Sequence, residues 1–356
     1  MKGARTAGEL IAANSDLQEF DRAGDGSLSR LLDQFLTAPF PKQTSGVLEQ
    51  SVGNPLFEQA LLSASQLVKI DGLPPDTSGR NLADALEAAY RDGEPNLLGL
   101  FRRLPGESLS IDLQALAYNA KRLRVHQDDA RLLVEEGIAM TPASDSLAES
   151  GASGWTRSQG RFSVSHRAQP LEITVLQPKR SSNQKLVVIS HGLWDEPASF
   201  EGWGRLLAAN GYTVLLPRHP GSDSEQQKEL LSGAAPPPSA KELRFRPLDV
   251  TALLDGIEAG SLLSGQQLDV DDVAVVGHSW GATAALQLSG LQTTSKKLKT
   301  RCQNPLDPDR NLSWVLQCSW LSGADQGSLA DPRVKASVVV SPPMRLLFDE
   351  SSGPSL

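Results

Sequence analysis

Residues 273–282, which read Val-Ala-Val-Val-Gly-His-Ser-Trp-Gly-Ala, constrain the fold more than any other stretch of this chain. A short apolar run leads into the pattern G-x-S-x-G, and a helix-forming segment follows. This order predicts a strand, a tight turn and a helix, with Ser279 at the turn in a strained backbone conformation. Gly277 and Gly281 are expected where a side chain would clash. We interpret Ser279 as a nucleophile; the alternative is a glycine-rich turn without chemistry.

The rest of the C-terminal half alternates between strand and helix patterns. Continuous apolar runs at 185–190, 212–216 and 334–340 are typical of buried parallel strands, and 161–166 and 171–177 predict a pair of strands at a sheet edge. Helices are expected at 200–210, where Gly211 is a good C-cap, and at 248–259. Residues 291–333 are predicted to be an irregular insertion. The expected fold class is α/β, with a mostly parallel sheet covered by helices on both faces.

The N-terminal part, residues 1–142, predicts an all-helical domain. Apolar residues recur at spacings of three and four in four segments, separated by proline and glycine. These residues include Leu17, Phe20, Leu31 and Phe35, and the later segments are 56–69, 81–91 and 111–124. Residues 143–160 are small and polar, which is typical of a linker. We therefore expect three parts: a helical domain at 1–142, a linker at 143–160 and an α/β domain at 161–356.

Composition excludes several classes of protein. The net charge of −8 lacks the basic signature of a nucleic-acid-binding protein. No apolar run approaches the roughly 20 residues that span a bilayer, and the start lacks the apolar core of a signal peptide. These features predict a cytoplasmic protein as written, or a periplasmic or secreted one if the chain start is incomplete. The sequence does not determine the oligomeric state.

The two cysteines, Cys302 and Cys318, do not form a recognisable metal motif. They lack CxxC spacing, and none of the five histidines lies near them. No zinc site or other metal is therefore expected, and no cofactor motif stands out. The cysteines are either free thiols or one disulfide, and the sequence leaves both possibilities open.

A second loop supports the nucleophile interpretation. The loop at 190–193, Ser-His-Gly-Leu, directly follows a predicted buried strand. Folds that carry a serine in a G-x-S-x-G turn place an oxyanion-hole donor in such a loop. The backbone N–H groups of Leu193 and Trp280 are the expected donors. The alternative is that this loop only turns the chain. We expect His191, Trp194 and His278 at the edge of the pocket. Trp194, Trp203 and Trp280 are candidates for an acyl pocket, although core packing is the ordinary role of a tryptophan.

The chain does not show the general base that a serine nucleophile requires. The acid and the histidine normally follow the serine in this fold, but no histidine follows Ser279. The five present are His126, His166, His191, His219 and His278. His126 is expected on a solvent-exposed helix and His278 in packing, while His191 and His219 are considered as unusual bases. The acids after Ser279, which are Asp325, Asp331 and Asp349, lack the expected strand-end context.

Counting strands offers an explanation for this absence. The run at 334–340 would be the sixth strand, whereas the acid normally follows the seventh and the histidine the eighth. The simplest expectation is a sequence that ends before these two strands, or a degenerate relative.

Four blocks in the α/β part carry a family resemblance. They lie at 186–193, 217–222, 246–250 and 277–281, and together they resemble the bacterial branch of α/β-hydrolases known as predicted dienelactone hydrolases, which is similar to platelet-activating-factor acetylhydrolases. Residues 97–105 and 110–113 resemble the helical domain of unknown function that precedes such hydrolases. Residues 311–318, with Cys302 upstream, resemble the insertion these proteins carry. Paired cysteines would suit an oxidising compartment.

The resemblance implies a serine hydrolase that cleaves a small-molecule or lipid-like carboxylic ester. It assigns Ser279 as nucleophile and the N–H groups of Leu193 and Trp280 as oxyanion-hole donors, and it gives no counterpart here for the family's acid and histidine. The alternative hypothesis is a truncated or degenerate, catalytically inactive module that uses the fold for binding.

Overall fold

A computed structural model shows the chain as two compact units. One comprises residues 1–130 and 229–237, and the other comprises 131–228 and 238–356. The structure describes residues 25–65, 67–74, 76–106, 109–137, 154–180, 182–304, 307, 310–325, 327–349 and 352–353, together with Glu9, Gln18, Glu19, Asp21 and Arg22. Leu17, Phe20 and most of the predicted linker, residues 143–153, lie outside this description.

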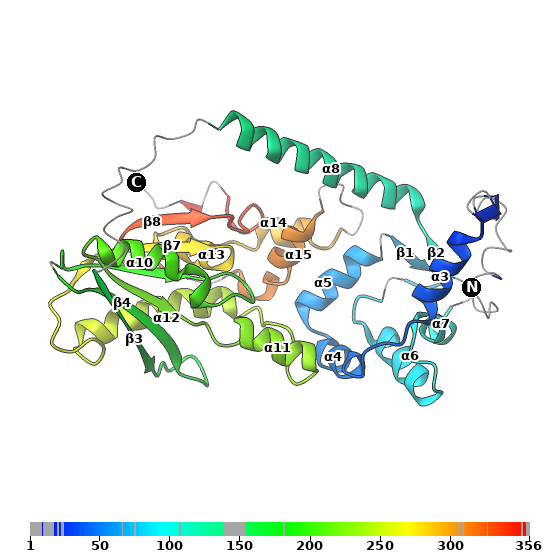
Figure 1. The fold of residues 1–356 in the computed structure, drawn as a ribbon, viewed down its shortest axis with the longest axis horizontal. Coiled ribbons are helices and arrows are strands. Elements are labelled where there is room, and N and C mark those ends of the chain that lie inside the picture. Colours follow the sequence, from blue (N-terminus) through cyan, green and yellow to red (C-terminus); the bar gives the residue numbers. More distant parts are fainter. Residues whose placement is uncertain are drawn as a thin grey trace. The chain divides into compact units, whose positions relative to one another are not determined.

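The first unit is mainly helical, as expected. Its helices are α3 (Ser27–Thr37), α4 (Thr44–Ser51), α5 (Pro55–Ala64), α6 (Arg80–Arg91) and α7 (Leu97–Arg103), and α8 (Leu113–Glu136) begins in it (Figure 1). Leu48, Leu86 and Leu100 are buried together at its centre. The segment 229–237 belongs to this unit because Gly233 packs against Gly46, where an added Cβ on Gly233 would lie 2.8 Å from the Gly46 carbonyl carbon.

Two short strands in the first unit were not predicted. Strands β1 (Val68–Ile70) and β2 (Leu109–Ile111) pair antiparallel, Val68 opposite Ile111. The predicted helices at 56–69 and 111–124 are therefore corrected to α5, which ends at Ala64, and α8, which starts at Leu113. Each strand has only three residues, too short for alternation to show in the sequence.

A six-stranded sheet forms the centre of the second unit. Its strands are β3 (Trp155–Phe162), β4 (Leu171–Pro178), β5 (Lys185–Ser190), β6 (Thr213–Pro217), β7 (Asp269–His278) and β8 (Val334–Val340), in the order β3-β4-β6-β5-β7-β8. β3 and β4 are antiparallel, and β4 runs antiparallel to β6. The pairs β6–β5, β5–β7 and β7–β8 are parallel. The predicted mostly parallel sheet is confirmed, but its first strand begins at Trp155 rather than at 161.

Helices cover both faces of this sheet, and the alternation along each strand explains how. In β5, Leu186 and Val188 pack with Leu253 of α12 (Glu242–Glu258) and with Leu288 of α13 (Trp280–Leu288). The intervening residues Val187 and Ile189 face the other side. They pack with Phe200 at the end of a 3-10 turn and with Ala208 of α10 (Glu201–Ala209). This is the expected result for a buried parallel strand with side chains of period two.

One predicted helix begins earlier than expected, and one helix lies where a polar loop was expected. α12 starts at Glu242, before the predicted 248, and accommodates Pro247 within it. The preceding polar loop contains α11 (Ser224–Ser232). Helix α10 ends as predicted before Gly211, which has a φ of 95°.

The segment 291–333 is structured, which corrects the expectation of an irregular insertion. It contains α14 (Lys296–Arg301), α15 (Leu312–Cys318) and a 3-10 turn at Leu321–Gly323. A disulfide joins Cys302 to Cys318, which decides the question that the sequence left open. Trp314 and Trp320 pack around it with Trp280 in one buried cluster. The insertion therefore has its own apolar core, which continues to the residue after Ser279.

Candidate active site

The turn between β7 and α13 holds Ser279 in a strained backbone conformation. Ser279 has a φ of 52° and a ψ of −117°, a region that residues with a side chain rarely adopt. The flanking glycines permit this turn. A Cβ on Gly277 would lie 2.2 Å from the Gly281 carbonyl oxygen, and a Cβ on Gly281 would lie 2.1 Å from that of Ser190. Both expectations for the two glycines are confirmed.

The loop after β5 lies beside this turn. Ser190 at the end of β5 is in register with Gly277 of β7. A Cβ on Gly192 would lie 3.2 Å from the Ser279 Cβ, so the loop backbone approaches the serine closely. The N–H of Trp194 donates to the Ser222 carbonyl oxygen at 2.8 Å. Within the described residues, the N–H groups of Leu193 and Trp280 have no hydrogen-bond acceptor, which leaves both available to an oxyanion.

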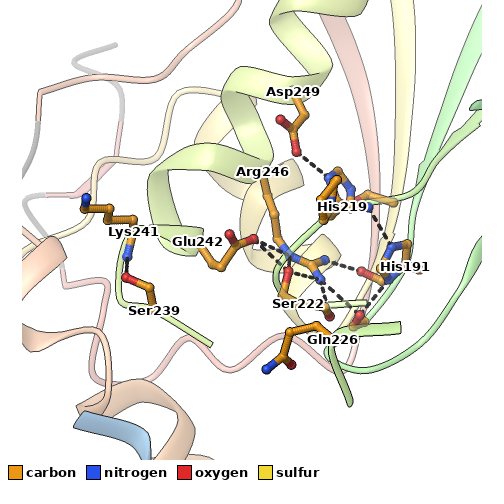
Figure 2. A network of polar contacts seen from close by, with 12 residues as sticks. His191, His219, Ser222, Gln226, Ser239, Lys241, Glu242, Arg246 and Asp249 are labelled. Atoms are coloured by element: carbon orange, nitrogen blue, oxygen red, sulfur yellow. Dashed lines mark hydrogen bonds and ion pairs between the residues drawn. The ribbon is translucent and has the colours of Figure 1, made fainter. Parts of the chain in front are cut away.

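A buried hydrogen-bonded chain runs from this loop into helix α12 (Figure 2). Nδ1 of His191 lies 2.7 Å from the Gly192 carbonyl oxygen and donates to it. The N–H of His219 donates to Nε2 of His191 at 3.1 Å. Nδ1 of His219 lies 2.6 Å from Oδ2 of Asp249, and its Nε2 lies 2.9 Å from the Ser190 hydroxyl. These partners assign a proton to Nδ1 of both imidazoles.

Burial keeps both imidazoles in this chain neutral. It lowers the pKa of His191 well below its usual value, and the nearby Arg246 cation acts in the same direction. Burial and Arg246 also lower the pKa of His219 to about 4. Asp249 stays ionised: burial alone would raise its pKa, but hydrogen bonds from His166, His219 and Arg167 outweigh burial and hold it well below the usual range.

Four buried charges accompany these imidazoles, and their signs balance. Arg167 contacts Asp249 at 2.7 Å and Glu242 at 2.9 Å. Arg246 lies 3.8 Å from Glu242 and donates to the carbonyl oxygens of His191 and Gly192. Side chains of all four residues are at most 5% exposed. Because each cation has an anionic partner, the group can be buried without an unpaired charge.

The pocket residues expected from the sequence have different environments. His191 is buried in the chain described above. Trp194 is half-buried, and its Nε1 donates to Oε1 of Gln226 at 2.7 Å. The ring of His278 packs against Phe200 at 5.7 Å between centroids, in line with a packing role, while its Nδ1 is buried without a partner among the described residues.

Two of the three tryptophans considered for an acyl pocket have other environments. Trp280 is 1% exposed and packs against Trp320, with 4.5 Å between the ring centroids. Trp203 is 46% exposed and lies edge-on to Phe200. For each tryptophan, core packing was the alternative to a place in the acyl pocket. Trp280 is packed in the core.

Among the residues that the structure describes, no base contacts the Ser279 hydroxyl. All five histidines lie within the described residues, and none hydrogen-bonds to this serine. His219, considered as an unusual base, uses both ring nitrogens elsewhere. Among the acids, Asp325 accepts from Ser295 and Lys299, and Asp331 accepts from Arg333. Asp349 lies 3.4 Å from the Thr294 hydroxyl.

The sequence did not predict that Arg246 donates to the carbonyl groups of His191 and Gly192, or that His219 and Asp249 are hydrogen-bonded. Their blocks, 217–222 and 246–250, stood out only through the family resemblance, since no spacing rule links an arginine on a helix to carbonyl groups more than fifty residues earlier. Over the described ranges, no group of metal-ligating side chains gathers. No helix there combines the length and the apolar character that crossing a bilayer requires.

Most of the sheet-containing part is similar to known proteins. Residues 186–354 match the model of the alpha/beta hydrolase family. A ferulic acid esterase from Streptomyces cinnamoneus is a similar solved structure, with 16% identity and a TM-score of 0.30. That match covers 42% of this chain and 56% of the esterase, so the chain spans about half of that protein. No curated protein matches.

Proposed function

We propose that the domain containing residues 186–354, which match the alpha/beta hydrolase family, is a serine hydrolase that cleaves carboxylic esters through an acyl-enzyme at Ser279. The observation that carries this proposal is the strained turn at Ser279 beside two unengaged N–H groups, those of Leu193 and Trp280. Strain of this kind is typical of functional sites, because the surrounding structure must maintain it against its cost of about 1–3 kcal/mol. The sequence resemblance to dienelactone and platelet-activating-factor hydrolases supports a small-molecule or lipid-like ester as substrate.

The reaction would proceed in two stages. The Ser279 hydroxyl oxygen attacks the ester carbonyl carbon while its proton passes to a water molecule acting as base, since no described side chain contacts this hydroxyl; the same water returns the proton to the leaving alcohol. The carbonyl oxygen becomes an oxyanion, which accepts hydrogen bonds from Leu193 and Trp280. Collapse breaks the ester C–O bond, and the alcohol departs with a proton. Water then attacks the acyl-enzyme by the same route and releases the carboxylic acid.

A second candidate is a hydrolase-fold domain that binds a ligand without cleaving it. The observation that favours it is that no histidine of this chain contacts Ser279. Since a serine hydroxyl is a weak nucleophile without a base, the two candidates differ in the reactivity of Ser279.

Labelling with a fluorophosphonate probe separates the two. If Ser279 is activated, the purified 356-residue chain should incorporate the probe at Ser279, as read by peptide mass spectrometry, and Ser279→Ala should abolish incorporation. The variant Ser289→Ala, which changes a serine at the far end of α13, is a matched control that should label like the parent. A folded chain that shows no labelling, with folding checked by circular dichroism, would exclude the enzyme and favour the binding module.

A further inference from the structure

We propose that Arg246 is a positioning residue that orients the Gly192–Leu193 peptide and so directs the Leu193 N–H into the oxyanion hole. The inference rests on the proposed function, because it concerns a donor of the same site. Arg246 belongs to α12 and is 1% exposed.

One guanidinium holds two successive carbonyl groups of the loop (Figure 2). Nη1 of Arg246 donates to the His191 carbonyl oxygen at 2.5 Å, and Nη2 donates to that of Gly192 at 3.1 Å. In a trans peptide, the C=O and the following N–H point in opposite directions. Fixing the Gly192 carbonyl towards Arg246 therefore turns the Leu193 N–H away from the arginine. Trp194 is excluded as the donor because its N–H is already bonded to Ser222.

The Gly192 carbonyl receives a second hydrogen bond, from Nδ1 of His191. His191 keeps the required tautomer because its other nitrogen accepts from the N–H of His219. Two donors on one carbonyl, one of them charged, polarise the peptide and make the Leu193 N–H a stronger donor. Arg246 thus acts on both the direction and the strength of this donor.

Arg246 is anchored on its other side by Ser222. Its Nε and Nη2 donate to the Ser222 hydroxyl at 3.1 and 2.9 Å, and Nη2 also donates to the Ser222 carbonyl oxygen at 3.2 Å. The Ser222 hydroxyl in turn donates to Glu242 at 2.7 Å. Burial lowers the pKa of Arg246 to about 10, which leaves it a cation at neutral pH.

The same guanidinium also contacts the second candidate donor. The Arg246 Cζ lies 5.7 Å from the centroid of the Trp280 ring, the residue whose N–H is the other expected donor. Arg246 therefore touches both segments that would form the hole. A lysine could not reproduce this arrangement, because a single ammonium lacks the planar fork of five N–H groups.

The test is chemical rescue of Arg246→Ala. We expect this variant to label with fluorophosphonate about 100-fold more slowly than the parent chain, the typical loss for one oxyanion-hole donor. Free guanidinium at millimolar concentration should restore a large part of the rate by occupying the space left by the side chain. Arg246→Lys keeps the charge without the fork and should be slowed about 10-fold or more.

Arg310→Ala is the matched control, because Arg310 is also buried and donates to a backbone carbonyl, that of Cys302 at 2.8 Å. It lies in the insertion and should label within about threefold of the parent, without rescue by guanidinium. Equal slowing in Arg310→Ala, or a folded Arg246→Ala variant that labels at the parent rate, would overturn the positioning role while leaving the proposed function intact.

Hydrogen exchange gives a readout that does not depend on reactivity. The amide exchange rate of residues 191–194 should rise in Arg246→Ala and fall again when guanidinium is added. If the alanine variant does not fold, Arg246→Lys replaces it, and the exchange rate of the same residues should rise in that variant. If the parent chain is not labelled, the proposed function fails, and exchange alone then decides the role of Arg246. Unchanged exchange in these residues would refute it.

Discussion

Gly281 lies where the turn around Ser279 leaves no room for a side chain. A Cβ at this position would lie 2.1 Å from the Ser190 carbonyl oxygen, a contact with backbone rather than with a side chain that can rotate away. The helix and strand would have to separate to admit one methyl group. Ser190 also holds the hydroxyl that contacts His219, so the displacement would reach the buried polar chain.

We predict that Gly281→Ala lowers the free energy of unfolding by about 3 kcal/mol, at the upper end of typical overpacking costs. Gly202→Ala in α10 is the control, since an added Cβ there meets nothing within 4 Å. It should stabilise the chain by about 0.5–1 kcal/mol, the usual gain of alanine over glycine in a helix. Urea denaturation measures both. A Gly281→Ala variant as stable as the parent would contradict the tight approach.

For single residues, the sequence predicts those whose contacts lie within a few positions along the chain. Gly277, Ser279 and Gly281 lie within five positions, so their pattern carries the turn geometry. The contacts of Arg246 join a helix to a loop more than fifty residues away, and such contacts depend on how strands and helices pack. The sequence placed Leu193 and Trp280 as oxyanion donors, and that role remains a prediction.

Among the elements, the insertion between α13 and β8 depends on more than helix propensity. Helices α14 and α15 have six and seven residues, too few to be stable alone. Their stability comes from the buried cluster around Trp314 and Trp320 and from the disulfide between Cys302 and Cys318.

Replacing both cysteines with alanine is therefore expected to cost about 3 kcal/mol, the loop-entropy value for a closed loop of about 15 residues; this disulfide spans 16 positions. The melting temperature of the Cys302→Ala/Cys318→Ala variant should be lower than that of the parent chain and should not change when a reductant is added. The melting temperature of the parent chain should fall once a reductant has broken its disulfide. An unchanged melting temperature in the double variant would show that packing alone holds the insertion.

The strands were predicted better than this insertion, for a physical reason. Lys185–Ser190 and Val334–Val340 match their expected ranges, because both are apolar runs of strand length. Lys185–Ser190 is buried as expected for an inner parallel strand. The predicted burial of Val334–Val340 is wrong: this strand lies at the sheet edge, and Val338 is 55% exposed, since an apolar run does not determine a strand's place in the sheet. β1 and β2 were missed because their pairing spans some forty positions, and the helices of the insertion because their stability is tertiary.

On the scale of the whole molecule, the buried histidines link stability to pH. His219 has a pKa of about 4 in the folded chain, below the usual 6.5, because burial disfavours its charged form. Between these two values the unfolded chain binds more protons than the folded one. Stability is therefore fully present above pH 6.5 and is lost as pH falls towards 4.

The free energy of unfolding should consequently fall by about 3 kcal/mol from His219 alone between pH 7 and pH 4. His219→Asn removes the titrating ring, so its own stability should depend less steeply on pH across this window, although the variant is less stable at pH 7. Chemical denaturation at a series of pH values measures the two slopes. Parallel slopes for parent and variant would contradict a neutral buried His219.

The assignment of residues 229–237 to the helical unit has a consequence for how the chain can be divided. The polypeptide passes from one unit to the other three times, so no single cut yields both units whole. A gene fusion joined at 143–160 would deliver a helical part without the segment that packs against Gly46. Residues 229–237, which include the end of α11, would therefore have to be transferred together with the helical unit in any exchange of the two parts.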